Sequence, residues 1–282
     1  MYNFYSFYNI KALMYPLHSY FMKIREICMA EILGHRVVGS GSNKVIVLHD
    51  WSVSCEGDYE YALPFFNLEK LTMAFVDVRG YGRSKNIIGS YNTDEITADI
   101  QAVAENLGWE KFSLIGHSMT GMAVQKIMCR LSDKVQKVIA TVPIPASGFP
   151  LDNETFGFFE SMASNDEAFQ GGMHALTSSI YGNGWTNRKL EQNRNTVDAV
   201  AMKEYAAMWS KENFADEVRG SKTPIMVMFG AHDNEGLRAD ANRDKFKDWY
   251  PNYSEVILST GHYPMIEAPV AYAKAVEEYL LS

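Results

Sequence analysis

The chain has 282 residues, of which 47% are hydrophobic and 21% are charged, and its formal net charge is −8. This length is enough for one large α/β domain or two small ones with a substantial core. The acidic balance argues against a nucleic acid or an anionic membrane as the partner, because both require a basic patch.

Residues 1–28 are rich in Tyr and Phe but are interrupted by polar residues and by Pro16. They lack the basic start, unbroken apolar run and cleavage site of a signal peptide, and their apolar runs are too short to span a bilayer. We interpret this segment as an N-terminal extension upstream of a natural start at Met29, because a recognisable strand pattern begins just after that residue. A helical arm packed on the body and a membrane-surface segment are the alternatives.

Strand-like and helix-like stretches alternate after Met29, which is typical of an α/β fold with a mostly parallel central sheet and helices on both faces. Residues 32–38 and 44–49 are predicted to form the first strand pair, joined by the glycine-containing turn at 39–43. The other predicted strands are 71–78, 112–115, 135–142, 224–229 and 255–258, and the predicted helices include 93–107, 120–131 and 269–281. Residues 29–142 and 223–282 are therefore expected to form the core.

The loop at 77–84 contains Gly80-Tyr81-Gly82 directly after a predicted strand. It lacks the Gly-x-x-x-x-Gly-Lys-Ser/Thr arrangement of a phosphate loop, and a single Gly-x-Gly is weak support for dinucleotide binding. We interpret Asp77 and Arg79 as residues that brace this loop below the functional site.

Ser118 lies in Gly-His-Ser-Met-Thr-Gly at 116–121, between a predicted strand and a predicted helix. A sharp strand-to-helix turn lifts a serine hydroxyl clear of the sheet and needs small flanking residues. The pattern Gly-x-Ser-x-Gly is met except at Thr120, where glycine is expected, and Gly121 follows. We predict that Ser118 is a nucleophile; a chance Gly-x-Ser before a helix is the alternative.

A serine nucleophile needs a base and an orienting acid, and in hydrolases with this turn the chain order is nucleophile, acid, histidine. Asp233 follows the predicted strand 224–229, and His262 follows the strand 255–258. We predict that Asp233 is the acid and His262 the base. Glu235 is an alternative acid, and His232 is interpreted as structural.

Residues 143–222 interrupt the alternation with helical patches and no convincing strand, and they are rich in Phe, Met and Trp. We predict a helical cap (lid) over an apolar pocket, because the insertion follows the strand after the Ser118 strand. An ordinary helical subdomain with its own small core is compatible with this interpretation.

Two backbone N–H groups are expected to stabilise an oxyanion. One is that of Met119, at a helix N-terminus directly after Ser118, and the other is that of Trp51, in the loop after the strand 44–49. The Trp51 indole and His117 are also predicted to contact the substrate. A packing role for Trp51 is compatible with both.

The chain from about residue 31 to 281 resembles the α/β-hydrolase superfamily, and most of all its serine esterase and haloperoxidase-like members with a helical cap. The resemblance is carried by 49–51, 77–84, 116–121, 230–233 and 261–262. It implies a triad of Ser118, His262 and Asp233 with oxyanion donors at Trp51 and Met119. Asp50, where many relatives have glycine, and Thr120 depart from the pattern. Haloalkane dehalogenases and epoxide hydrolases of this superfamily use an aspartate nucleophile. The serine at position 118 therefore argues against both activities.

We therefore predict a serine hydrolase that cleaves an ester-type bond of a small, apolar substrate through an acyl-enzyme, with no metal or organic cofactor. A small-ligand receptor of the same fold with slow or no turnover is an alternative from another class. Cofactor-free perhydrolase or haloperoxidase, lactonase and C–C bond hydrolase activities are further alternatives, because the fold does not decide among them.

The three cysteines, Cys28, Cys55 and Cys129, are widely spaced and form no CxxC pair. This pattern predicts neither a zinc site nor a disulfide framework and favours a reducing compartment. Together with the lack of a signal peptide, it leads us to expect a cytoplasmic protein. Cys55 is interpreted as a half-buried loop residue rather than a reactive thiol.

Overall fold

A seven-stranded sheet organises the computed structural model, which describes residues 31–282. The strand order is β1-β3-β2-β4-β5-β6-β7, with β1 antiparallel to β3 and every other pair parallel. The strands are β1 (His35–Gly39), β2 (Asn43–Leu48), β3 (Leu71–Val76), β4 (Phe112–His117), β5 (Val135–Thr141), β6 (Ile225–Gly230) and β7 (Tyr253–Leu258). The predicted α/β class and mostly parallel sheet are confirmed, whereas the extension at 1–28 lies outside the described residues.

The predicted pairing of residues 32–38 with 44–49 is wrong. Strand β3 lies between β1 and β2, with His35 opposite Val76 and Asn43 opposite Leu71. The turn at 39–43 therefore passes the beginning of β3, where a Cβ at residue 41 would lie 1.9 Å from the Lys70 carbonyl carbon. Glycine allows this close approach. The intervening strand comes later in the chain, so the local pattern of the first two strands does not reveal it.

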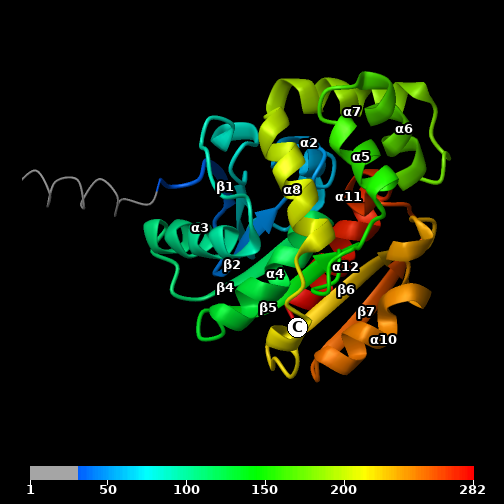
Figure 1. Cartoon of the computed structure of the whole chain (residues 1–282). Coiled ribbons are helices and arrows are strands. Elements are labelled where there is room, and N and C mark those ends of the chain that lie inside the picture. Colours follow the sequence, from blue (N-terminus) through cyan, green and yellow to red (C-terminus); the bar gives the residue numbers. More distant parts are fainter. Residues whose placement is uncertain (1–30) are drawn as a thin grey trace, which may run out of the picture. The chain divides into compact units, whose positions relative to one another are not determined.

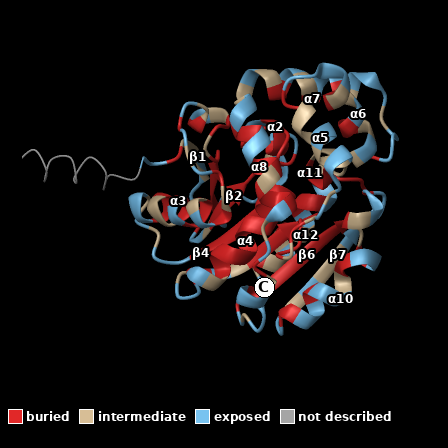
Figure 2. Ribbon diagram, viewed as in Figure 1, coloured by how far each residue is buried: buried red, intermediate tan, exposed pale blue. Residues whose placement is uncertain are grey.

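Helices cover both faces of the sheet (Figure 1). On one face lie α3 (Thr93–Asn106), α4 (Met119–Arg130) and α10 (Ala239–Trp249), and on the other α2 (Cys55–Tyr59) and α12 (Pro269–Leu280), whose Tyr59 and Tyr272 rings pack together. Every residue of β3, β4 and β6 is buried, as expected for a parallel sheet covered on both faces (Figure 2). Shorter elements are η2 (Leu63–Phe65), η3 (Gly82–Ser84), η4 (Glu235–Leu237) and α11 (Pro264–Glu267).

The helical insertion, residues 143–222, lies between β5 and β6. It contains α5 (Asn153–Ser161), α6 (Asp166–Leu176), α7 (Asn183–Thr196), α8 (Ala199–Lys211) and α9 (Ala215–Val218). Asp152, Asn165 and Asp198 accept hydrogen bonds from first-turn N–H groups and so fix the starts of α5, α6 and α8. In Figure 1, α5 to α8 gather beyond the carboxyl ends of the strands.

The α7–α8 part of the helical insertion is bonded to the core. Tyr81 and Val197 form an isolated β-bridge, and the Asp198 N–H donates to the Gly80 carbonyl at 2.8 Å. The Asn193 amide donates to the Ser52 carbonyl at 2.7 Å. Within residues 31–282, no helix is long and apolar enough to cross a bilayer.

Candidate active site

Ser118 is held in a strained turn between β4 and α4, with φ +52° and ψ −109°. Such a conformation persists only where its surroundings impose it. A Cβ at residue 116 would lie 2.4 Å from the Thr120 carbonyl oxygen, and one at residue 121 would lie 2.8 Å from the Cβ of Pro143. Gly116 and Gly121 therefore permit the close approaches that the turn requires.

Thr120 stands at the motif position where glycine is expected, and its hydroxyl has hydrogen-bond partners on the backbone. The Oγ1 atom accepts from the His117 N–H at 3.0 Å and donates to the His49 carbonyl at 2.6 Å. The side chain is fully buried. This departure thus adds a tie between the Ser118 turn and the loop after β2.

Ser118, His262 and Asp233 form a continuous hydrogen-bonded row. His262 Nε2 lies 2.9 Å from Ser118 Oγ, and His262 Nδ1 lies 2.8 Å from Asp233 Oδ2. Asp233 and His262 follow the neighbouring parallel strands β6 and β7, so their loops meet at one edge of the sheet. With Nδ1–H directed at the carboxylate, Nε2 is free to accept the serine proton.

Glu235 and His232, which lie close to Asp233 in the chain, have other surroundings. The Glu235 side chain is 91% exposed and faces Arg238 at 4.0 Å. His232 is exposed, and its Nε2 lies 3.1 Å from the Ser259 hydroxyl. Neither residue has a hydrogen bond to His262 among the described contacts.

The backbone N–H groups of Trp51 and Met119 are the predicted oxyanion donors. Within residues 31–282, neither the Trp51 nor the Met119 N–H has a protein acceptor. Asp50 Oδ1 accepts from the Ser52 and Val53 N–H groups, each at 3.0 Å, and so fixes the loop after β2. The Asp50 side chain thereby shapes the turn that presents the Trp51 N–H.

A cavity of about 150 Å³ adjoins Ser118 and His262. Much of its wall is apolar and comes from the helical insertion. Its lining residues are Asp50, Trp51, Ser52, Ser118, Ile144, Phe149, Leu151, Thr155, Phe159, Leu176, Trp209, Asn234, Leu237 and His262. The serine hydroxyl thus faces a small space suited to an apolar group.

The structure separates the two predicted substrate contacts. Trp51 lines the cavity, donates from Nε1 to the Met202 carbonyl at 2.7 Å, and packs edge-to-face on Phe159 and Trp209. His117 is fully buried and does not line the cavity, so its prediction as a substrate contact is wrong. The reason is that this last residue of β4 directs its ring toward Asp58 of α2.

A buried charge cluster, made of Asp50, Asp58, His117 and Lys189, lies beside the row. His117 Nδ1 is 2.7 Å from Asp58 Oδ2, and Lys189 Nζ is 3.6 Å from Asp58 Oδ1. Burial alone would raise the pKa of Asp58, but the His117 and Lys189 charges lower it to about 2. Burial alone would lower the pKa of His117, but Asp58 raises it above its usual value. The sequence carries no local signal for this cluster, because Asp58, His117 and Lys189 are far apart in the chain.

Asp50, Asp58 and His117 place potential ligand atoms within 4.8 Å of one another. However, Asp58 Oδ2 and His117 Nδ1 are bonded to each other, and the Lys189 ammonium adjoins the same carboxylate. The protein's own cations therefore already neutralise this donor set, which does not fit a metal ion.

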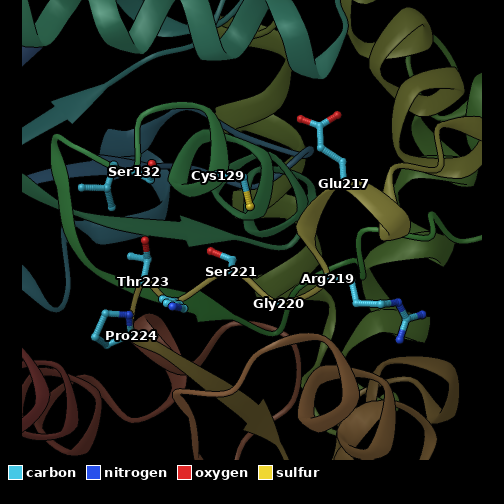
Figure 3. Close-up of a pocket in the computed structure, with 10 residues that line it drawn as sticks. Cys129, Ser132, Glu217, Arg219, Gly220, Ser221, Thr223 and Pro224 are labelled. Carbon is cyan, nitrogen blue, oxygen red and sulfur yellow. The ribbon is translucent and has the colours of Figure 1, made fainter.

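The two described cysteines do not form a rival nucleophilic site. Cys55 is buried in α2, rather than half-buried in a loop as predicted, and burial raises the pKa of its thiol. Cys129 lines a hollow of about 640 Å³ (Figure 3). The hollow also includes Val135 and Pro224, at the amino ends of β5 and β6, whereas Ser118 follows the carboxyl end of β4. Burial also raises the pKa of Cys129. Both thiols are thus kept protonated and weakly nucleophilic.

A sequence model of the family described as the α/β hydrolase fold matches residues 64–269. A non-heme haloperoxidase from Rhodococcus erythropolis is 25% identical over 213 residues, covering 68% of this chain and 76% of the relative. A bifunctional esterase/perhydrolase from Acinetobacter calcoaceticus is 31% identical over 206 residues, covering 66% of this chain and 72% of the relative. An esterase from Exiguobacterium antarcticum has a similar structure, with a TM-score of 0.78 and 17% identity. The match covers 89% of this chain and 96% of the esterase. This last similarity shows a shared fold.

Proposed function

The chain belongs to the α/β-hydrolase fold family, and from this premise we propose that it is a serine hydrolase that cleaves an ester-type bond of a small, apolar substrate. The observation that carries the proposal is the row Ser118 Oγ, His262 Nε2 and Asp233 Oδ2, with spacings of 2.9 and 2.8 Å, at the edge of an apolar cavity. The esterase and esterase/perhydrolase relatives support it.

In the proposed mechanism, His262 removes the Ser118 proton as the hydroxyl attacks an ester carbonyl. Asp233 holds the imidazole with Nδ1 protonated and stabilises the imidazolium that forms. The N–H groups of Trp51 and Met119 bind the tetrahedral oxyanion, each donor being worth about 3 kcal/mol in comparable enzymes. His262 then protonates the leaving alcohol, and water releases the acyl group by the reverse sequence.

The cavity limits the size of the group beside the reacting carbonyl. An apolar protein cavity of about 150 Å³ can hold a benzene-sized molecule. The cavity at Ser118 has about this volume and is lined by aromatic and aliphatic side chains. We infer that the helical insertion acts as a cap and that the substrate places a short alkyl or single-ring group there.

The test compares p-nitrophenyl acetate, butyrate and octanoate with the wild-type protein and Ser118→Ala. We expect kcat/KM to be highest for the short esters and the variant to lose at least about 10³-fold in kcat. Circular dichroism should show an unchanged fold. If Ser118→Ala retains most of the activity, the nucleophile assignment is wrong; a single burst without turnover in the wild type would instead indicate a ligand receptor.

The similarity to a bifunctional esterase/perhydrolase favours perhydrolysis as a second candidate activity. The same acyl-enzyme would be released by hydrogen peroxide instead of water, giving a peracid. We expect peracid formation from a short ester and peroxide to depend on Ser118. Peracid production that continues in Ser118→Ala would contradict this candidate.

A further inference from the structure

His117 directs both ring nitrogens at oxygen atoms. Nδ1 lies 2.7 Å from Asp58 Oδ2, and Nε2 lies 2.7 Å from the backbone carbonyl oxygen of His262. A neutral imidazole has one N–H and one lone pair, so at one of these contacts the lone pair would face an acceptor. Only the imidazolium donates at both contacts.

The surroundings of His117 suit a positive charge. The groups that face it are Asp58 from α2, Asp50 after β2, and His262 and Tyr263 after β7, with Lys189 of α7 beyond Asp58. Asp50 and Asp58 supply two negative charges, and Lys189 and His117 balance them when His117 is protonated. The cluster is therefore neutral when His117 is an imidazolium. Since buried charges are stable only when they are paired, this favours the protonated form.

Lys189 brings the helical insertion into the same cluster. Its Nζ is buried, lies 3.6 Å from Asp58 Oδ1 and is 4.1 Å from the centre of the Tyr263 ring. Within the described part of the chain, Lys189 Nζ and Asp58 Oδ1 have no hydrogen-bond partner, so this ion pair is their principal polar contact. The charge on Lys189 therefore competes with His117 for the same carboxylate.

We propose that the imidazolium of His117 is a positioning residue for the proposed hydrolysis: it holds the His262 backbone so that Nε2 faces Ser118, and the Asp58–Lys189 pair sets the pH at which this hold is lost. The inference rests on the proposed function of Ser118 and His262. His117 itself touches neither the substrate nor the reacting atoms.

The loss of the proton has a defined structural effect. The N–H bond to the Asp58 carboxylate is charge-assisted and stronger than the one to a neutral carbonyl, so Nδ1–H is retained. The Nε2 lone pair then faces the His262 carbonyl across 2.7 Å. The resulting repulsion displaces the backbone of the base, so kcat falls at alkaline pH while KM changes little.

The first experiment follows the nitrogen-15 signals of labelled histidine over a pH series, with His117→Gln used to assign the His117 signals. We expect both ring nitrogens of His117 to be protonated at pH values where free histidine is mostly neutral. The alkaline limb of kcat should have the same midpoint as this titration. A neutral His117 at pH 7, or kcat that stays constant through its titration, would overturn the proposal.

A matched pair of variants on α7 tests the role of Lys189. Lys189→Met removes the buried cation and leaves the Asp58 charge to His117, so the His117 titration and the alkaline limb should both rise, by roughly 0.5–1 pH unit. Arg188→Met removes a half-exposed neighbouring cation and should shift neither. Equal midpoints in the two variants and the wild type would refute the role of Lys189.

These readouts separate the inference from the proposed function. The histidine signals are measured without substrate, so they report on His117 even if the protein has no esterase activity. Conversely, if Ser118→Ala abolishes turnover but His117 is neutral, the hydrolase assignment stands and the positioning role fails. The wild-type titration decides the charge state of His117 even if Lys189→Met does not fold.

Discussion

Replacing Thr120 with Val tests whether its hydroxyl stabilises the Ser118 turn. The two side chains have nearly the same shape, so the exchange removes hydrogen bonds while conserving volume. The hydroxyl accepts from the His117 N–H and donates to the His49 carbonyl, at 3.0 and 2.6 Å, in a fully buried position. Thr120→Val therefore leaves both backbone groups without this partner.

The magnitude follows from the cost of an orphaned buried polar group. Each costs about 1–3 kcal/mol, so with two such groups the free energy of unfolding should fall by about 2–6 kcal/mol in Thr120→Val. Urea unfolding followed by circular dichroism measures this difference, provided that the slope against urea is unchanged. Because the turn also carries Ser118, kcat for a short ester should fall as well.

Thr120→Ser is the matched control, since it keeps the hydroxyl and loses one methyl group. We expect it to lose about 1 kcal/mol and to retain most activity. If Thr120→Val unfolds within about 0.5 kcal/mol of Thr120→Ser, the two hydrogen bonds do not stabilise the turn and the reasoning is refuted.

Three further predictions concern the same region and its surroundings. Asp233→Asn should lower kcat by about 10⁴ with little change in KM, because a neutral amide cannot hold the imidazolium; steady-state kinetics decides, and a loss under tenfold would contradict the assignment. Gly116→Ala should lower the free energy of unfolding, measured with urea, by about 3 kcal/mol, because the new Cβ would lie 2.4 Å from a carbonyl oxygen. Gly157→Ala is the control: residue 157 lies in α5 with open space around it, so this variant should raise the free energy of unfolding by about 0.5–1 kcal/mol. The pKa of Asp58 is lowered to about 2, so its contribution to stability is complete above the usual carboxyl range and is lost as the pH falls toward that value. Asp58→Asn should accordingly flatten the acid limb of the unfolding free energy, and an unchanged slope would argue against the buried pair.

The parts of the site that follow from local pattern could be predicted from the sequence. Ser118 has small neighbours between a strand and a helix. Asp233 follows the buried strand β6, and His262 follows β7, the partly exposed strand at the edge of the sheet. The structure brings these three side chains together because the carboxyl ends of parallel strands share one edge of the sheet. Order along the chain was therefore sufficient to identify the candidates.

The parts that depend on distant contacts could not be predicted. Lys189 lies in α7 and Asp58 in α2, and nothing near either residue indicates an ion pair between them. The direction of the His117 ring depends on that pair, which is why its predicted contact with the substrate is wrong. The position of β3 between β1 and β2 has the same origin, because strand pairing is decided by the whole sheet rather than by the turn that joins two strands.

Different stretches of the helical insertion are attached to the rest of the protein unequally, and this has a consequence for how the protein can change. The α7–α8 junction is fixed by the Tyr81–Val197 bridge and by the Asp198–Gly80 bond, and a Cβ at Gly80 would lie 2.1 Å from that of Ala201. In contrast, the stretch 149–176 supplies most of the insertion's share of the cavity wall, Trp209 of α8 being the main exception. The attachment to the core and most of the insertion's share of the cavity wall thus lie in separate stretches of sequence. For the proposed hydrolase, new specificities would be reached by varying 149–176 alone, in nature or in a directed library, without rebuilding the α7–α8 attachment that holds the insertion in place.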